Sequence, residues 1–233
     1  MPISLVLLPG MDGTGDMFGP LLEALDRAVN CVIVRYPPTE PLGYAALTSL
    51  ARAALPRDHS YVVLGESFSG PIAVTLAAER HKGLMGLIVC ASFVSNPMPW
   101  VRPLAPLLGG LPIGPALRFF GPRKLFGGYQ THALRELFDA TADRVSTTVL
   151  LARIRDALEI DVSTLLASVD VPTMYIQATK DTLLPEAAAE RFSCLAPKAN
   201  VVKIDAPHGV LQCEPELAAR TILEFVRSVS QAP

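Results

Sequence analysis

Charged residues are scarce in this 233-residue chain, since only 18% are Asp, Glu, Lys or Arg and the formal net charge is −2. This balance gives no indication of a nucleic-acid partner, because such partners are bound through clustered positive charge. Half of the residues are hydrophobic, which excludes a disordered chain. The length fits one domain with a substantial core, with room for an insertion.

Cysteines are few and long apolar segments are lacking. The four cysteines form no C-x-x-C pair, and they are Cys31, Cys90, Cys194 and Cys213. This usage is typical of small apolar side chains in a reducing compartment. No basic region or long apolar segment precedes Pro9, and no apolar run reaches the length of a membrane span. We therefore expect a cytoplasmic protein with no membrane span.

The stretch from Tyr61 to Gly70, YVVLGESFSG, organises the rest of the chain. A short β-branched and apolar run predicts a buried strand, and the residues after Gly70 predict a helix with proline in its first turn. A strand that passes into a helix within so few residues needs a very sharp turn, with Ser67 at its tip. Small residues are required on both sides of that serine, and Gly65 and Ser69 supply them. This pattern is typical of a nucleophile elbow.

Strands and helices alternate along most of the sequence. Further apolar runs predict buried strands at residues 3–9, 31–36, 86–91, 171–178 and 201–204. Helical patterns follow at residues 17–28, 43–55 and 185–195, and the chain closes with an amphipathic stripe made of Ala218, Ile222, Phe225, Val226 and Val229. This alternation predicts an α/β fold, in which a mostly parallel sheet carries helices on both faces.

The alternation breaks between residues 93 and 168. Seven prolines from Pro97 to Pro122 exclude long helices up to about residue 128, and helical patterning returns over 130–168. Structureless connections of this length are uncommon in compact domains unless they are functional. We predict an inserted cap at residues 93–168 over a core formed by residues 1–92 and 169–233.

The glycine-rich loop Gly10–Gly15 follows a strand and precedes a helix, an arrangement that invites a dinucleotide-binding interpretation. The fingerprint fails, because Phe18 stands at the third glycine position. The end of the next strand, near Arg35-Tyr36, also lacks the acid that would bind a ribose. We therefore expect neither a nucleotide cofactor nor a metal.

A serine hydroxyl needs a base beside it, and the base needs an acid to orient it. The chain has four histidines, His59, His81, His132 and His208. In proteins with such an elbow, the catalytic residues follow one another along the chain in the order serine, acid, histidine. Among the four histidines, only His208 follows the last predicted strand, and it therefore comes after both the elbow serine and a candidate acid. Asp181 lies in the loop after the penultimate strand and is the predicted acid. Asp205 is the alternative, but it is only three residues from His208, and we expect it to stabilise the end of the last strand instead.

Four landmarks together resemble those of capped α/β-hydrolases. They are the Gly10-Met11 loop, the elbow from Gly65 to Gly70, the segment from Ala178 to Pro185, and Pro207-His208-Gly209. The resemblance covers essentially the whole chain but lacks the two leading strands of larger members, which implies a sheet of about six strands. It implies hydrolysis of an ester or thioester through an acyl-enzyme on Ser67. A serine at this position argues against haloalkane dehalogenases and epoxide hydrolases, which use aspartate there.

The oxyanion hole of this fold takes one backbone N–H from the loop after the first strand and another from the residue after the nucleophile. In this chain these donors are Met11 and Phe68. Many members of the family have His-Gly where this sequence has Pro9-Gly10. Since the donor is a main-chain amide, the missing histidine does not abolish the predicted hole.

The predicted cap is rich in apolar side chains and in positive charge. Trp100, Leu104, Phe119 and Phe120 are candidates for binding an acyl substrate, although most apolar cap residues would simply pack the cap onto the sheet. The charged residues from Pro97 to Arg135 are all basic: Arg102, Arg118, Arg123, Lys124 and Arg135. Such a surface suits an acidic acyl-carrier protein, as in the carrier-protein methyl-ester esterases that this chain also resembles. Ordinary solvated arginines are the simpler alternative.

The expected function is therefore hydrolysis of carboxylic esters of small to medium acyl groups. Two alternatives stay open. The chain could be a thioesterase or acyltransferase that acts on acyl-carrier or CoA substrates, or a ligand receptor built on a hydrolase fold with an idle triad.

Overall fold

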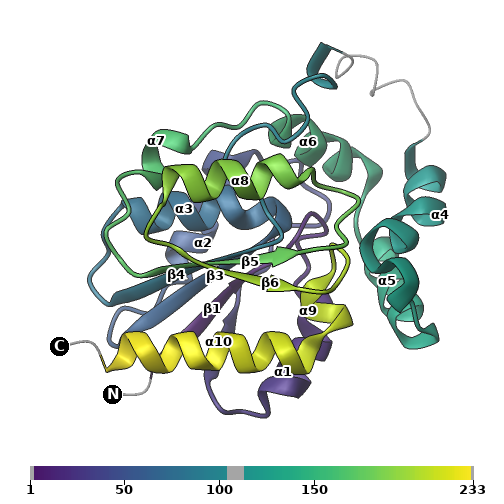
Figure 1. Ribbon diagram of the computed structural model, residues 1–233. Coiled ribbons are helices and arrows are strands. Elements are labelled where there is room, and N and C mark those ends of the chain that lie inside the picture. Colours follow the sequence, from purple (N-terminus) through teal and green to yellow (C-terminus); the bar gives the residue numbers. More distant parts are fainter. Residues whose placement is uncertain (1–2, 104–112, 232–233) are drawn as a thin grey trace.

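The computed structural model describes residues 3–103 and 113–231, in which six strands form one sheet (Figure 1). In chain order, β1 to β6 are Ser4–Leu8, Asn30–Ile33, Tyr61–Glu66, Leu84–Cys90, Thr173–Ala178 and Asn200–Ile204. Their spatial order is β2-β1-β3-β4-β5-β6, and every neighbouring pair is parallel. The α/β class and the parallel sheet of about six strands are confirmed.

Helices cover both faces of the sheet. α1 (Gly19–Leu25) and α10 (Pro215–Ser230) pack on one face, and α2 (Tyr44–Ala53), α3 (Gly70–Ala78) and α8 (Glu186–Leu195) pack on the other (Figure 1). Because both faces are covered, β1 and β3 are buried along their whole length, and this explains their continuous apolar sequences.

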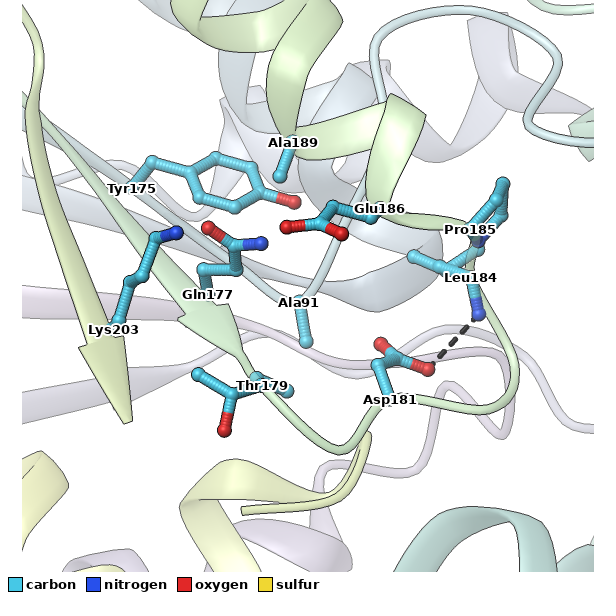
Figure 2. Close-up of a pocket in the computed structure, with 11 residues that line it drawn as sticks. Ala91, Tyr175, Gln177, Thr179, Asp181, Leu184, Pro185, Glu186, Ala189 and Lys203 are labelled. Carbon is cyan, nitrogen blue, oxygen red and sulfur yellow. Dashed lines mark hydrogen bonds between the residues drawn. The ribbon is translucent and has the colours of Figure 1, made fainter. Parts of the chain in front are cut away.

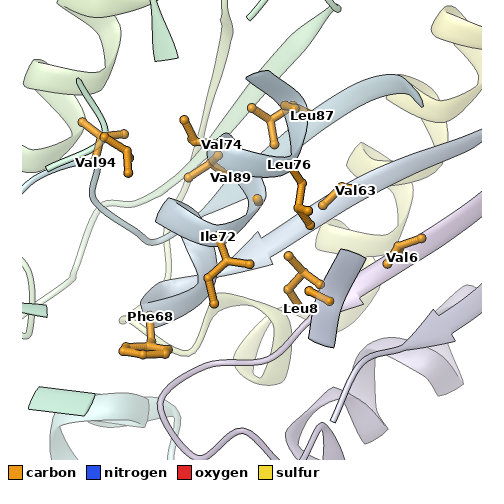
Figure 3. Close-up of a cluster of buried hydrophobic side chains, with 14 of the residues drawn as sticks. Val6, Leu8, Val63, Phe68, Ile72, Val74, Leu76, Leu87, Val89 and Val94 are labelled. Carbon is orange, nitrogen blue, oxygen red and sulfur yellow. The ribbon is translucent and has the colours of Figure 1, made fainter. Parts of the chain in front are cut away.

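Alternate residues of each strand belong to two separate hydrophobic cores. Val6 and Leu8 of β1 pack with the α2, α3 and α8 layer, where Ile72 and Phe192 join them (Figure 3). Leu5 and Leu7 of β1 pack with α1 and α10 on the opposite face. The predicted stripe of α10 is buried in this second core, which confirms its amphipathic pattern.

The chain between β4 and β5 carries the helices α4 (Ile113–Phe126), α5 (His132–Arg144), α6 (Thr147–Ala157) and α7 (Ser163–Leu166). Figure 1 shows α4 and α5 beyond the ends of the strands, beside the short helix α9 (Val210–Cys213). The side chains of Thr131 and Ser146 accept hydrogen bonds from backbone N–H groups in the first turns of α5 and α6. These caps explain why the two helices begin where they do. The division into a core and a cap at residues 93–168 remains a prediction.

The expectation that prolines exclude long helices up to residue 128 is wrong, because α4 is a helix of 14 residues. Pro115 is the third residue of α4, where a backbone N–H has no partner within the helix and none is lost. Pro122 lies inside the helix and removes one hydrogen bond without ending it.

Within residues 3–103 and 113–231, no helix combines the length and the hydropathy needed to cross a membrane.

Candidate active site

All six strands end at the same edge of the sheet, since they are parallel. β1 lies between β2 and β3. The chain therefore passes from β1 to its neighbour on one side, β2, and then crosses over to its neighbour on the other side, β3, so the strand order reverses direction at β1. In open α/β sheets, ligands bind at such a switch point, outside the carboxyl ends of the strands. The loop Pro9-Gly10 follows β1 there, and Ser67 follows β3.

Ser67 occupies a sharp turn between β3 and α3. Its φ angle of 48° lies in the left-handed region, which a residue with a side chain rarely adopts. A Cβ atom at Gly65 would lie 2.6 Å from the Ser69 carbonyl oxygen, and one at Gly70 would lie 1.9 Å from Ser92 Oγ. The absence of side chains at these two positions is therefore a steric requirement of the turn, as the sequence pattern predicts.

The structure brings together Ser67, His208 and Asp181 from three separate loops. Ser67 Oγ lies 2.8 Å from His208 Nε2, and His208 Nδ1 lies 2.7 Å from Asp181 Oδ2. The side chains of His208 and Asp181 are 6% and 11% exposed. The contacts run in the order nucleophile, base, acid, which is the geometry needed to deprotonate a serine hydroxyl.

Asp181 is held as a carboxylate by its surroundings. Burial by itself would raise its pKa, but hydrogen bonding to His208, the charge of that ring and the N–H groups of Leu183 and Leu184 together lower the pKa. These N–H groups donate to Asp181 Oδ1 at 2.8 and 2.9 Å, whereas Asp181 Oδ2 contacts His208.

The rival residues lie elsewhere. Asp205 accepts hydrogen bonds from Lys180 at 2.8 Å and Thr179 at 3.1 Å, so it braces the end of β6 as expected. The other three histidines contact acids of their own: His59 lies 2.7 Å from Asp58, His81 lies 2.7 Å from Glu79, and His132 lies 3.2 Å from Glu136.

Phe68 follows Ser67 in the chain, and the loop that carries Met11 approaches Ser67 at Gly10. A Cβ atom at Gly10, the neighbour of Met11, would be 3.9 Å from Ser67 Cβ. Gly10 to Gly13 form a turn in which the Gly13 N–H donates to the Gly10 oxygen at 3.1 Å. Phe68 belongs to the short 3-10 turn Ser67–Ser69, and N–H groups at the start of a helix have no partner within it. A role for the Met11 and Phe68 N–H groups in an oxyanion hole remains a prediction.

Several residues around the site were not predicted from sequence. Phe68 stacks on Tyr44, with ring centroids 4.6 Å apart, and the Tyr44 hydroxyl donates to the Phe68 oxygen at 3.0 Å. Ser92 Oγ donates to the Ser67 oxygen. Arg153 of α6 is 1% exposed and donates to backbone oxygens of the Gly10–Gly13 turn. An arginine in an amphipathic helix gives no signal that distinguishes this buried position from a solvated one.

Glu66, directly before the nucleophile, is a buried carboxyl group with 6% exposure. Burial raises its pKa to about 7, with a further upward contribution from the charge of Asp12. Hydrogen bonding from Gln212, the charge of His208 and the Gly10 N–H act in the opposite direction. The Gln212 contact is 2.9 Å, from Nε2 to Glu66 Oε1. Glu66 is therefore a buried acid, directly before the nucleophile, whose pKa lies near neutral pH.

Two cavities lie near the strand ends, and Ser67 lines neither of them. One, of about 300 Å³, lies between β5 and α8 and is lined by Asp181. Polar side chains such as Gln177 and Glu186 point into it (Figure 2). The other, of about 450 Å³, lies between α8 and the segment after β4, and Trp100 lines it.

The four candidates for substrate binding differ in their surroundings. Trp100 is 65% exposed at the rim of the second cavity. Phe119 and Phe120 are 58% and 57% exposed on α4, where they contact each other edge to face, and they line neither cavity. Leu104 lies outside the described residues. Substrate binding by these four side chains remains a prediction.

The basic residues from Pro97 to Arg135 are partly neutralised by acids of α5. Arg118 pairs with Asp143, and Arg135 lies 2.7 Å from Asp139. Arg123 instead lies over the Phe119 ring, 5.0 Å from its centroid. No group of three or more His, Cys, Asp or Glu side chains in the described part of the chain could hold a metal ion.

Comparison with known sequences identifies one family and one curated relative. The model of the alpha/beta hydrolase family matches residues 5–220. A polyketide synthase, ThaQ of Burkholderia thailandensis, is 29% identical over 255 aligned residues. The alignment covers 97% of this chain but only 12% of that protein, so the chain spans a small part of the length of this relative.

Solved structures with the same fold come from proteins with varied names. The enol-lactonase from Burkholderia xenovorans and an esterase from Exiguobacterium antarcticum each have a TM-score of 0.81 and 17% identity, with coverage of 97% of this chain and 92% of theirs. A bromoperoxidase from Bacillus anthracis has a TM-score of 0.82 and 15% identity at the same coverage. At these identities the likeness shows the fold alone.

Proposed function

The chain belongs to the alpha/beta hydrolase family, and on that premise we propose that it is a serine hydrolase that cleaves carboxylic esters through an acyl-enzyme on Ser67. The observation that carries the proposal is the continuous contact from Ser67 Oγ to His208 and on to Asp181, at 2.8 and 2.7 Å. Small to medium acyl groups are the proposed substrates.

Acylation begins when Ser67 Oγ attacks the carbonyl carbon of the ester. The hydroxyl proton passes to His208 Nε2, and the carbonyl electron pair moves onto the oxygen, which becomes an oxyanion. Asp181 fixes the imidazole tautomer and stabilises the imidazolium. The N–H groups of Met11 and Phe68 donate to the oxyanion. The intermediate then collapses: the oxyanion electron pair re-forms the carbonyl, the bond to the leaving oxygen breaks, and His208 gives its proton to that oxygen, so the group leaves as an alcohol.

Deacylation repeats the sequence with water. His208 takes a proton from water, the hydroxide attacks the acyl carbonyl, and Ser67 leaves with the proton that His208 returns. The products are the carboxylic acid and the free enzyme. The positive φ angle of Ser67 supports this role, since strained backbone persists where it aims a functional side chain.

Hydrolysis of a p-nitrophenyl ester series, from acetyl to long acyl chains, tests this proposal. Ser67→Ala should abolish turnover, and wild-type protein quenched during turnover should carry the acyl mass on the peptide that contains Ser67. Ser49→Ala, a change at an exposed serine of α2, is the matched control and should retain activity. Full turnover by Ser67→Ala would refute the mechanism.

The second candidate function is that of a thioesterase or acyltransferase whose substrate is an acyl group on a carrier or CoA. The match to part of a protein named a polyketide synthase supports this alternative. Esters and thioesters of the same acyl group, compared by kcat/KM, separate the two functions. Addition of an alcohol acceptor distinguishes transfer from hydrolysis through the product that forms. A ligand-induced rise in Tm without turnover of any of these substrates would instead support a receptor.

We also propose that Trp100 and the aromatic pair Phe119 and Phe120 bind the acyl group or its carrier, and that the protein is cytoplasmic. The free state of all four cysteines supports a reducing location. Trp100→Ala should raise KM for longer acyl chains without changing kcat, because the side chain is remote from the reacting atoms. Cell fractionation with an antibody checks the location.

A further inference from the structure

The two N–H groups assigned to the oxyanion hole belong to peptide planes whose carbonyl ends are fixed by other groups. A peptide bond is planar and trans, so the carbonyl oxygen of one residue points opposite to the N–H of the next. The Gly10 oxygen therefore shares a plane with the Met11 N–H, and the Ser67 oxygen shares a plane with the Phe68 N–H. Whatever binds these two oxygens sets the direction of both donors.

We propose that Ser92 and Arg153 are positioning residues for the oxyanion hole, an inference that rests on the proposed hydrolase function. Ser92 acts on the Phe68 donor. Its Oγ donates to the Ser67 oxygen, which is the carbonyl end of the peptide plane that carries the Phe68 N–H. Ser92 is itself fixed by Tyr175, whose hydroxyl donates to the Ser92 oxygen at 2.7 Å.

Arg153 acts on the Met11 donor through the turn. The turn hydrogen bond from the Gly13 N–H to the Gly10 oxygen, at 3.1 Å, aims the Met11 N–H. Arg153 Nη1 donates to both carbonyl oxygens inside this turn, at 2.8 Å to Met11 and 2.7 Å to Asp12. A Cβ atom at Gly13 would lie 2.6 Å from the same nitrogen, so the guanidinium packs directly against the turn.

The surroundings of Arg153 favour positioning over a general contribution to stability. Its other hydrogen bond is from Nη2 to the Pro37 oxygen at 3.1 Å, and it forms no ion pair with any of the described residues. Its Nε has no hydrogen-bond partner among them either. Burial lowers the pKa of Arg153 and outweighs the charges of Asp12 and Asp156, which favour the guanidinium. The Tyr36 ring centroid also lies 5.7 Å from the guanidinium carbon. An apolar side chain would fill the space at lower cost. Such a side chain could not make the hydrogen bonds that the Arg153 guanidinium donates to the carbonyl oxygens, and these bonds explain a charged residue at this position.

The test compares Ser92→Ala, Arg153→Lys and Arg153→Met with wild-type protein. A p-nitrophenyl ester reports turnover, and a trifluoromethyl ketone reports oxyanion binding, because Ser67 Oγ adds to its carbonyl carbon and leaves the oxygen as an oxyanion. Removal of a hole donor typically lowers kcat about 10²–10³-fold, so misdirection of one should lower it by about tenfold to a hundredfold. We expect this loss of kcat in Ser92→Ala and in Arg153→Met. The kcat of Arg153→Lys should lie between those of wild-type protein and Arg153→Met.

Two further readouts separate positioning from stability. The inhibition constant of the ketone should rise by the same factor by which kcat/KM falls, whereas KM and the pH profile, which depend on ground-state binding and the triad, should not move. Val149→Ala, a buried change in α6 with no hydrogen bond to the turn, is the control for lost stability. Arg155→Met, at an exposed arginine of the same helix, is the control for lost charge. Both controls should keep wild-type kcat.

The inference is overturned if Ser92→Ala and the Arg153 variants lose only thermal stability, as Val149→Ala does, and retain kcat and ketone affinity. It is also overturned if KM alone changes. Ser92→Ala removes one oxygen atom and keeps the test decisive if Arg153→Met does not fold. Wild-type protein that neither hydrolyses the ester nor binds the ketone would refute the proposed function as well, so the two failures are distinct.

Discussion

Glu66→Gln should make the protein more stable at alkaline pH while leaving it unchanged in acid. Glutamine has the shape of a protonated glutamate and carries no charge. Glu66 is 6% exposed, and its pKa is raised to about 7, first by burial and then by the charge of Asp12. The Gln212 hydrogen bond at 2.9 Å does not offset the loss of water. In the folded protein, the charged form of Glu66 is therefore the less stable one.

The sign and magnitude follow from proton linkage. Between its ordinary value of 4.5 and about 7, Glu66 holds a proton in the folded state that it has released in the unfolded state. Unfolding then releases a proton, so the free energy of unfolding falls as the pH rises through this window. A difference of about 2.5 pH units, at about 1.4 kcal/mol per unit, corresponds to about 3–4 kcal/mol. That stability is fully present below pH 4.5 and is lost above about pH 7.

Urea denaturation of wild-type protein and Glu66→Gln at pH 5 and pH 8 measures this difference. The variant should be more stable than wild type by about 1 kcal/mol at pH 5 and by about 3 kcal/mol at pH 8. Glu79→Gln is a control of opposite sign, because hydrogen bonding to Arg52 lowers the pKa of Glu79 and its charge is stabilising. A gap between wild type and Glu66→Gln that is the same at both pH values would refute the reasoning.

Three further substitutions test the elbow and the triad. Asp181→Asn should lower kcat by about 10⁴-fold in ester hydrolysis, because the imidazole loses its orienting carboxylate, and a kcat within tenfold of wild type would contradict this. Gly70→Ala should lower the free energy of unfolding by about 1–3 kcal/mol or more in urea, because the methyl group would lie 1.9 Å from Ser92 Oγ; unchanged stability would be the contrary result. Ser69→Gly should cost about 1 kcal/mol of stability, since the hydroxyl lies 2.9 Å from that of Tyr36, but should leave kcat within about threefold of wild type.

The elbow could be predicted from sequence because its constraints are local. Only a residue without a side chain fits at Gly65, where a Cβ atom would lie 2.6 Å from a carbonyl oxygen four residues later. Apolar runs also predict all six strands, and for β1 and β3 the reason is that strands buried on both faces have continuous apolar sequences. The edge strands β2 and β6 are mainly apolar although they are only partly buried. The order of elements then nominated Asp181 and His208, since parallel strands deliver their following loops to one edge of the sheet.

The support behind the site could not be predicted in the same way. Ser92 follows β4 in a loop with no recognisable motif, and its proposed role depends on the Ser67 oxygen 25 positions away. Glu66 occupies a position of the elbow that tolerates any residue, so its raised pKa comes from tertiary burial. The presence of prolines gives a wrong prediction for α4, because Pro115 lies in the first turn, which has no hydrogen bond to lose.

The segment between β4 and β5 that we predict to be a cap also supplies Arg153, the proposed positioning residue. Suppose that α4 to α7 were replaced by a short linker that joins the two strands. The Met11 and Asp12 oxygens would lose the nitrogen that now binds them at 2.8 and 2.7 Å, and the turn beside Ser67 would be released at its outer end. The shortened protein would keep Ser67, Asp181 and His208. It should therefore still react with a fluorophosphonate, which needs an activated serine, yet bind a trifluoromethyl ketone at least tenfold more weakly, because the ketone needs a directed N–H pair. Equal ketone affinity in the shortened and full-length proteins would show that the core alone directs both donors.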